Sequence, residues 1–319
     1  MLDPGLLCAL SLLYLGNAEK AAGVLDDRGA SIWMARHRLS TSLQEADIQR
    51  LRSEVVQAYQ QPESCLPSCE CQRTVHFLHI PKSGGESIEL ALNLTKNHHT
   101  AMQRFGKRPQ RLNDVIAVVR SPHERVLSWF KYALHGASKP GSHRVRGVQP
   151  KVMSRMALNA SNLANTTGKS SDLRSAFELF VGELYTEPTA MHYEHLWTHG
   201  SSTEYLFHDN GQLAPRLVLR FEQLEADWKR AVRCGLGIDA PLDHINDSSS
   251  GTSLRPRLTE MFRQHPDSSW WYSPRAWCVV RQAFDVDYEI FGHLPIPSSP
   301  SARPTEGAQS TKGGEIQRQ

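Results

Sequence analysis

The feature that most constrains the fold is a short apolar run that leads into two adjacent glycines and then into a helix-forming segment. Residues 75–80 (VHFLHI) are apolar and partly β-branched, which is typical of a buried strand. Residues 88–92 (IELAL) have the composition of a helix. The turn between them, 81–87 (PKSGGES), therefore aims several backbone N–H groups and a helix N-terminus at one point. This geometry predicts a site for an anion.

Individual residues of the turn strengthen that prediction. Gly84 and Gly85 let the main chain approach a phosphate closely and accept a positive φ. Lys82 places a cation beside the same anion, and Ser87 offers a hydroxyl donor. The ATPase form of such a turn, G-x-x-x-x-G-K-[ST], carries its lysine at the end. Because Lys82 stands at the start, the sequence argues against a magnesium-dependent NTPase, although a tight turn without any ligand would use the same residues.

A second strand-to-helix junction follows. Residues 115–119 (VIAVV) form another apolar run that ends at Arg120, and Pro122 suits the first turn of the next helix. Ser128 lies on that helix, so that it can form a second anion pocket with Arg120. Because parallel sheets bind ligands at the carboxyl ends of their strands, the two pockets are expected side by side. Two phosphate sites on one ligand indicate a nucleotide that is phosphorylated at both ends.

The segments HIPKSGGESIE and VVRSPHERVLSWF resemble the 5′-phosphosulfate loop and the 3′-phosphate motif of sulfotransferases, which use 3′-phosphoadenosine 5′-phosphosulfate (PAPS). The resemblance is strongest to the Golgi glycan sulfotransferases of the heparan 2-O- and chondroitin type, and to related short proteins of protists and algae. Three more segments match in family order: 218–224 (VLRFEQL), 244–246 (HIN) and 287–292 (DYEIFG). The resemblance spans residues 73–293. It implies an α/β domain of the three-layer, P-loop-like sulfotransferase fold with a central parallel sheet.

The resemblance also implies roles for the two motifs. Lys82 would contact the bridging oxygen and the sulfuryl group of PAPS. The cradle of the 5′-phosphosulfate would consist of Ser83, Gly84, Gly85 and Ser87, and the 3′-phosphate would be held by Arg120 and Ser128. Glu86 stands where the family often has Thr, so its carboxylate is expected to point away from the phosphates. The implied reaction transfers the sulfuryl group to a hydroxyl and requires no metal.

The acceptor hydroxyl needs a general base within hydrogen-bond reach. His98 and His99 are the first candidates, because they follow Lys82 by sixteen and seventeen residues and precede the second strand. We favour His99, since similar proteins place a His-Thr segment there. Two adjacent histidines in an exposed loop are the alternative. Glu89 is the other candidate for the base, and its alternative is a solvated residue of the helix.

A third group of histidines has metal-ligand spacing. His192, His195 and His199 form H-x2-H-x3-H, but no H-E-x-x-H and no acid-rich partner segment accompany them. Ordinary packing, or contact of His192 and Trp197 with the acceptor, is therefore favoured over a metal site.

Charge is distributed unevenly along the chain. Residues 90–171 hold fourteen Lys and Arg and only two acids, so this segment carries +12 while the whole chain carries +3. Such an asymmetry indicates an anionic partner. The basic stretch 139–155 either steers an anionic glycan or is a solvated loop. No helix-turn-helix, zinc or aromatic RNA motif is present, so nucleic acid is not predicted as a partner.

Two features favour the secretory pathway, with the Golgi lumen or membrane as the expected place and the cytoplasm as the alternative. N-x-[ST] sequons occur at Asn93, Asn159, Asn165 and Asn246, and the cysteine cluster 65–71 (CLPSCEC) suggests disulfides or plain thiols. The apolar run 6–15 is shorter than the about 20 residues of a membrane span. It is either a signal-peptide core, an anchor or a packed helix, and it is the segment through which the chain could associate with a membrane.

These observations divide the chain into an N-terminal apolar segment and linker (1–39), a helical stem with the cysteine cluster (40–72), the sulfotransferase domain (73–294) with a mobile basic insertion (136–171), and a disordered tail (295–319). The expected function is sulfuryl transfer from PAPS to a hydroxyl, most readily on an anionic or neutral glycan. A non-catalytic glycan-binding protein that retains the fold is the alternative. The sequence carries no signal for an oligomeric state.

Overall fold

The computed structural model describes residues 43–60, 75–95, 97–106, 115–138, 155–186, 200–208, 210–229, 240–242 and 256–291. Within these residues, three short strands form a sheet: β1 (His76–Leu78), β2 (Val115–Val119) and β3 (Leu217–Arg220). They lie in the order β1-β2-β3 and both pairs are parallel. The central strand β2 is buried along its whole length, as an apolar β-branched run requires. The predicted α/β class with a central parallel sheet is confirmed.

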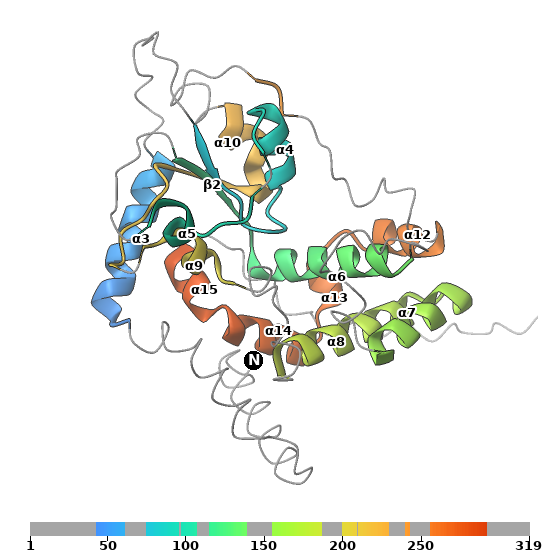
Figure 1. The fold of residues 1–319 in the computed structure, drawn as a ribbon. Coiled ribbons are helices and arrows are strands. Elements are labelled where there is room, and N and C mark those ends of the chain that lie inside the picture. Colours follow the sequence, from blue (N-terminus) through green and yellow to red (C-terminus); the bar gives the residue numbers. More distant parts are fainter. Residues whose placement is uncertain are drawn as a thin grey trace, which may run out of the picture.

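Helices cover both faces of this sheet (Figure 1). One face packs against α3 (Glu45–Gln60), α5 (Ala101–Phe105), α9 (Ser202–Leu206) and α15 (Asp285–Phe291). The other face packs against α4 (Gly85–Ala91) and, after the short 3-10 helix η4 (Phe221–Gln223), α10 (Leu224–Asp227). Side chains of β2 alternate between the two cores: Val115, Ala117 and Val119 face α3, and Ile116 and Val118 face α4. The strands and helices thus form three layers.

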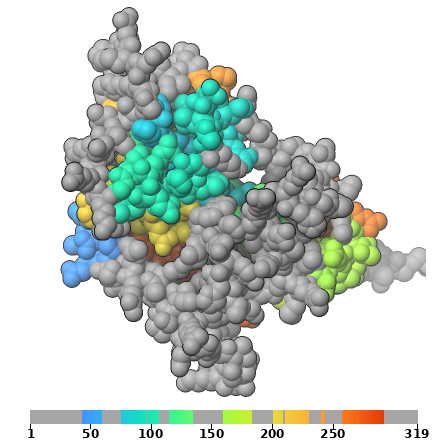
Figure 2. Space-filling view, in the orientation of Figure 1, coloured from blue at the N-terminus to red at the C-terminus, as the bar shows by residue number. Residues whose placement is uncertain are grey.

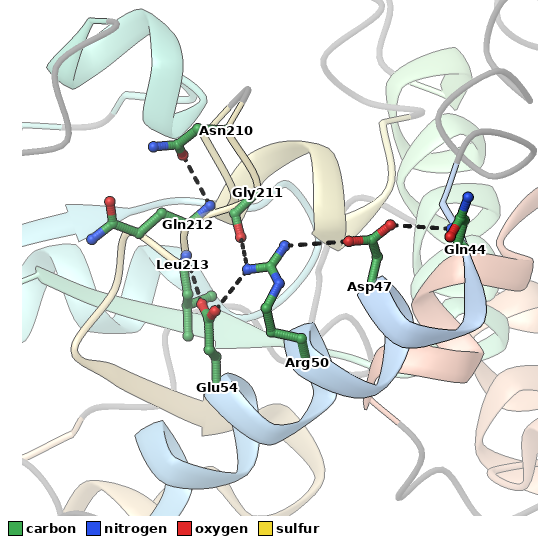
Figure 3. A network of polar contacts seen from close by, with 8 residues as sticks. All are labelled: Gln44, Asp47, Arg50, Glu54, Asn210, Gly211, Gln212 and Leu213. Carbon is green, nitrogen blue, oxygen red and sulfur yellow. Dashed lines mark hydrogen bonds and ion pairs between the residues drawn. The ribbon is translucent and has the colours of Figure 1, made fainter.

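Helix α3 belongs to this domain. The sequence pattern predicts a helix in a stem that precedes the domain, but Leu51, Val55 and Ala58 of α3 are buried in the core on the sheet. A polar network fastens the helix to the loop before β3 (Figure 3). In it, Arg50 Nη1 donates to the carbonyl oxygen of Gly211 (3.1 Å) and pairs with Glu54 (2.9 Å). The boundary expected at residue 73 therefore separates elements that share one core.

A second, helical core adjoins the sheet layers (Figure 1). It is formed by α6 (Pro122–Ser138), α7 (Arg155–Thr167), α8 (Ser170–Thr186), α12 (Pro256–Gln264), α13 (Ser268–Trp271) and α14 (Pro274–Ala283). Phe130, Phe177 and Trp271 are fully buried at its centre, and the ring centroids of the two phenylalanines lie 5.2 Å apart. Because α6 starts directly after β2, it connects the sheet to this helical body.

The prediction that residues 136–171 form a mobile insertion is wrong at both ends, since 136–138 belong to α6 and the other end, 155–171, is also mostly helical. These residues form α7 and the first turn of α8, and Ala164 is fully buried. The segment lacks long apolar runs, but small side chains on one helix face are enough to pack closely against a neighbouring helix. None of the described helices combines the length and apolar character that crossing a bilayer requires. The segments 1–39 and 295–319 lie outside the described residues.

Candidate functional site

The turn after β1 has the conformation of an anion cradle. Lys82 has φ 66° and Gly84 has φ 78°, and α4 begins at the next residue, Gly85. A positive φ is uncommon for a residue other than glycine and strains the backbone by about 1–2 kcal/mol. Such strain persists where the surrounding structure enforces it, and it clusters at functional sites. The backbone of Lys82 is therefore held in place by the fold around the turn.

Both glycines are required by close contacts. A Cβ atom on Gly84 would lie 2.7 Å from the ring of Phe221, and one on Gly85 would lie 2.2 Å from the ring of His79. Real Cβ atoms do not approach other atoms so closely. The turn is thus closed on one side by η4 and on the other by the end of β1.

Among the described residues, the buried polar atoms without a hydrogen-bond partner include Ser83 Oγ in the turn and Arg120 Nε at the end of β2. Ser83 is only 1% exposed. Buried polar groups in native proteins are nearly always satisfied, so an exception asks for an explanation such as a ligand or an ordered water. Both atoms can donate a hydrogen bond, which suits an anionic ligand. The residues present therefore fit an anionic group such as a phosphate.

The two predicted anion motifs touch each other. Arg120 stands at the end of β2, and its Nη1 donates to the carbonyl oxygen of Lys82 (3.2 Å). Its guanidinium carbon lies 4.0 Å from the centroid of the Phe221 ring. The order of the strands predicts this proximity, because β1 and β2 are parallel neighbours and end at the same edge. One small molecule can therefore contact both motifs.

Carboxylates also surround the Arg120 guanidinium. Its Nη2 donates to Glu124 Oε2 (3.2 Å), and Glu222 Oε1 accepts from the backbone N–H of Ser121 (2.8 Å). Burial lowers the pKa of Arg120, and the charges of Glu124 and Glu222 act in the opposite direction. A phosphate at Arg120 would compete with Glu124 for the same guanidinium. The sequence pattern alone gives no sign of this competition.

The other predicted donor-site residues lie around the turn. The Lys82 ammonium lies 4.3 Å from the ring centroid of Tyr132 on α6, which is a cation–π distance. Ser128 lies one helical turn before Tyr132 and is half-buried. Ser87 is half-buried in the first turn of α4, directly after Glu86. The structure thus brings the turn and α6 together on one side of the sheet edge.

Behind the turn lies a buried imidazole–carboxylate pair that sequence reasoning missed. His79 Nδ1 lies 2.8 Å from Glu89 Oε1, and these side chains are 4% and 7% exposed. Glu89 Oε1 also accepts from the backbone N–H of Asn97 (3.2 Å). The alternative of a solvated Glu89 is therefore wrong. The sequence signals were the imidazole of His79 near the end of a mostly apolar run and Glu89, which the sequence offered only as a base or as a solvated helix residue.

The two candidate bases differ in their surroundings. His98 is half-buried; its ring centroid lies 4.3 Å from that of His79, and its Nδ1 lies 3.3 Å from the His79 carbonyl oxygen. His99 is exposed, and its backbone N–H donates to the Asn97 side chain. In Figure 2 the α4 segment and the segment that ends in α5 lie side by side on the visible face. His98 therefore contacts His79, which lies just before the donor turn, whereas the hydrogen bond of His99 goes to Asn97.

The tautomer of His98 follows from its partner. A carbonyl oxygen can only accept a hydrogen bond, so Nδ1 of His98 carries the proton in this contact. In the neutral ring, Nε2 is then the nitrogen that can take up a proton.

Several predicted residues lie outside the described part of the chain: His192, His195, His199, Trp197, residues 139–154 and residues 244–246. Within the described residues, no group of three or more His, Cys, Asp or Glu side chains could hold a metal ion. Cys278 is disulfide-bonded, and all other cysteines of the chain lie outside the described residues.

Comparison with known proteins gives one match. The sequence model of a family described as the sulfotransferase family matches residues 70–293, which is most of the chain and includes both anion motifs. Neither the curated proteins nor the solved structures contain a match. The matched range begins after α3, although α3 shares the core of the domain.

Proposed function

Because the chain belongs to the sulfotransferase family, whose members transfer sulfuryl groups, we propose that its donor is PAPS and its acceptor a carbohydrate hydroxyl. The observation that carries the proposal is the direct contact between the Lys82 turn and Arg120, at 3.2 Å. Unpartnered donors on Ser83 and Arg120 border this contact. A nucleotide with phosphates at both its 3′ and 5′ positions satisfies the two motifs at once.

The donor would be held mainly by charge-assisted hydrogen bonds. The N–H groups of the turn, with the hydroxyls of Ser83 and Ser87, bind the 5′-phosphosulfate, and Arg120 with Ser128 binds the 3′-phosphate. Hydrogen bonds to ionised groups are about twice as strong as neutral ones. Glu124 competes with the 3′-phosphate for the Arg120 guanidinium, because it already accepts a hydrogen bond from Nη2.

Sulfuryl transfer asks the protein mainly for positioning and charge stabilisation, as phosphoryl transfer does. The acceptor oxygen forms a bond to sulfur while the bond between sulfur and the bridging oxygen breaks. Negative charge then develops on the bridging oxygen, and 3′-phosphoadenosine 5′-phosphate leaves. The Lys82 ammonium stabilises that charge. The ring of Tyr132, 4.3 Å away, keeps the ammonium near the turn between turnovers.

The proton of the acceptor hydroxyl goes to a base, for which we propose His98 Nε2. His98 is favoured over His99 because its Nδ1 is tied to the His79 carbonyl oxygen, next to the donor turn. The His99 side chain is exposed, and the hydrogen bond of its residue is made by the backbone N–H to Asn97. Glu89 is not proposed as the base, because its carboxylate is buried against the His79 ring.

Three features support a glycan acceptor and a secretory compartment. The segment 90–171 is strongly basic. Asn93 of the sequon N-L-T is exposed in a turn with φ 51°, which leaves its side chain accessible to modification. Cys278 is disulfide-bonded, as is common for proteins of oxidising compartments. A non-catalytic glycan-binding protein is the second candidate, and the occupation of Arg120 by Glu124 favours it.

The test is transfer of label from PAPS carrying ³⁵S to a panel of heparan, chondroitin and neutral glycans. We expect labelled glycan with wild-type protein, and a loss of at least about 100-fold in Lys82→Ala, because a preorganised charge at the reacting centre is worth about 10²–10³ in rate. Lys169→Ala is the matched control, since Lys169 is an exposed lysine of the same basic segment. Undiminished transfer by Lys82→Ala would refute the mechanism.

A further inference from the structure

The His79–Glu89 pair is a buried polar arrangement to which donor chemistry assigns no task. Burial of an imidazole and a carboxylate carries a free-energy penalty, because both groups lose their hydration. An apolar pair of similar size often stabilises a fold as well or better. The pair therefore needs a reason other than stability. Its neighbours indicate the reason, because the pair lies between the donor turn and the loop that carries the base.

The pair makes three contacts that link those two segments. The His79 ring edge lies so close to Gly85 that a single added Cβ would approach it to 2.2 Å. The His79 carbonyl oxygen accepts from His98 Nδ1 at 3.3 Å. Glu89 Oε1 accepts from the backbone N–H of Asn97 at 3.2 Å, one residue before His98. Each end of the pair thus touches one of the two segments whose relative position sets the reaction geometry.

We propose that His79 and Glu89 are positioning residues that set His98 against the donor turn, a role that rests on the proposed sulfotransferase activity. Glu89 holds the His79 ring and the Asn97 backbone with the same oxygen atom. The ring in turn abuts the turn at Gly85. The His79 carbonyl oxygen selects the His98 tautomer in which Nε2 takes the acceptor proton.

The arrangement differs from a proton relay. The contact from His98 goes to the main-chain carbonyl of His79, whereas Glu89 binds the His79 side chain. These two contacts use different atoms of His79, the main-chain oxygen and the ring Nδ1, so together they do not form one hydrogen-bonded path for a proton. The pair acts on catalysis through geometry, so its loss should lower kcat and leave the binding of the donor product nearly unchanged.

The first experiment is kinetic and uses the full-length protein. Glu89→Gln keeps the size of the side chain but removes its charge, and we expect kcat to fall by about 10- to 100-fold, the effect of a misplacement of the order of 1 Å. Binding of 3′-phosphoadenosine 5′-phosphate, measured by calorimetry, should change by less than about threefold. Asp287→Asn is the control: Asp287 is also a buried carboxylate, on α15, and its loss should leave the kcat of the folded protein unchanged.

A double-mutant cycle separates positioning from a general loss of structure. In a His98→Ala background, Glu89→Gln should have no further effect on kcat, because its effect passes through His98. If the fold-decrease in kcat of the double variant equalled the product of the two single decreases, the proposal would be overturned. A kcat of Glu89→Gln equal to that of wild type would also overturn it. His79→Asn, which retains a donor at the place of Nδ1, should preserve more activity than His79→Ala.

A spectroscopic measurement on the wild-type protein tests the contact between His98 and the His79 carbonyl oxygen even if no acceptor is found. In protein with ¹⁵N-labelled histidine, neutral His98 should show the Nδ1–H tautomer, identified by the signals that vanish in His98→Ala. The Nε2–H tautomer would overturn the proposal. Absence of label transfer by wild-type protein, together with the Nδ1–H tautomer, would instead contradict the proposed function and leave the positioning contact in place.

Discussion

Substitution of Gly85 by Ala tests the packing of the donor turn most sharply. The added methyl group would lie 2.2, 2.3 and 2.6 Å from three atoms of the His79 ring. The ring is buried and its Nδ1 is bonded to Glu89, so it cannot withdraw without losing that bond. Either α4 shifts away from the end of β1, or the buried pair breaks.

The size of the effect follows from these two routes. Overpacking of a close-packed site costs about 1–3 kcal/mol, and loss of a hydrogen bond to a charged group costs about 1.5–3 kcal/mol. Replacement of a helical glycine by alanine returns at most about 1 kcal/mol. We therefore expect Gly85→Ala to lower the free energy of unfolding by about 1–2 kcal/mol. Because the shift displaces the N–H groups of the turn, binding of 3′-phosphoadenosine 5′-phosphate should weaken at least about tenfold.

Urea denaturation and calorimetry measure the two effects. Gly182→Ala on α8 is the matched control, because a Cβ there meets no atom within 4 Å. That variant should be as stable as wild type or slightly more stable, with unchanged nucleotide binding. If Gly85→Ala behaved like Gly182→Ala in both assays, the close contact between the turn and His79 would be refuted.

Three further predictions concern single carboxylates and one histidine. Glu124→Gln should tighten binding of 3′-phosphoadenosine 5′-phosphate in calorimetry by up to about fivefold, because a partly exposed ion pair with Arg120 contributes under about 1 kcal/mol; weaker binding would contradict the competition. Burial lowers the pKa of His123 well below its ordinary value, so the unfolded chain binds its proton first and stability should fall as the pH drops below about 6.5. Urea denaturation of His123→Phe should show a pH slope smaller by up to about 1.4 kcal/mol per pH unit, and an unchanged slope would contradict this. Asp287→Asn should destabilise the protein by about 2–3 kcal/mol in the same assay, because its carboxylate accepts three hydrogen bonds at the start of α9; a loss below about 0.5 kcal/mol would contradict this.

The parts of the site that sequence reasoning predicted are local or follow from strand order. Residues 75–92 contain a strand, a glycine turn and a helix in direct succession, and such units depend on neighbouring residues. The proximity of Lys82 and Arg120 required one additional rule, that parallel neighbouring strands end at the same edge. Both the family and the parallel sheet were predicted from these segments and are confirmed.

The parts that were missed depend on the orientation of one element against another. His79 and Glu89 are ten residues apart, and only the docking of α4 on β1 brings their side chains to 2.8 Å. The sequence predicts a helical stem within residues 40–72, but it does not indicate which face of the sheet the apolar side of that helix covers. The helix at 155–167 was missed because small residues pack helices closely without an apolar run.

If Lys82 and Arg120 hold opposite ends of one nucleotide, the protein must distinguish nucleotides with and without a 3′-phosphate. Calorimetry should show that wild-type protein binds 3′-phosphoadenosine 5′-phosphate at least about tenfold more tightly than adenosine 5′-monophosphate, since a charge-assisted contact to the 3′-phosphate is worth about 1.5–3 kcal/mol. Arg120→Ala should abolish this preference. Equal affinity of the wild-type protein for the two nucleotides would contradict the account.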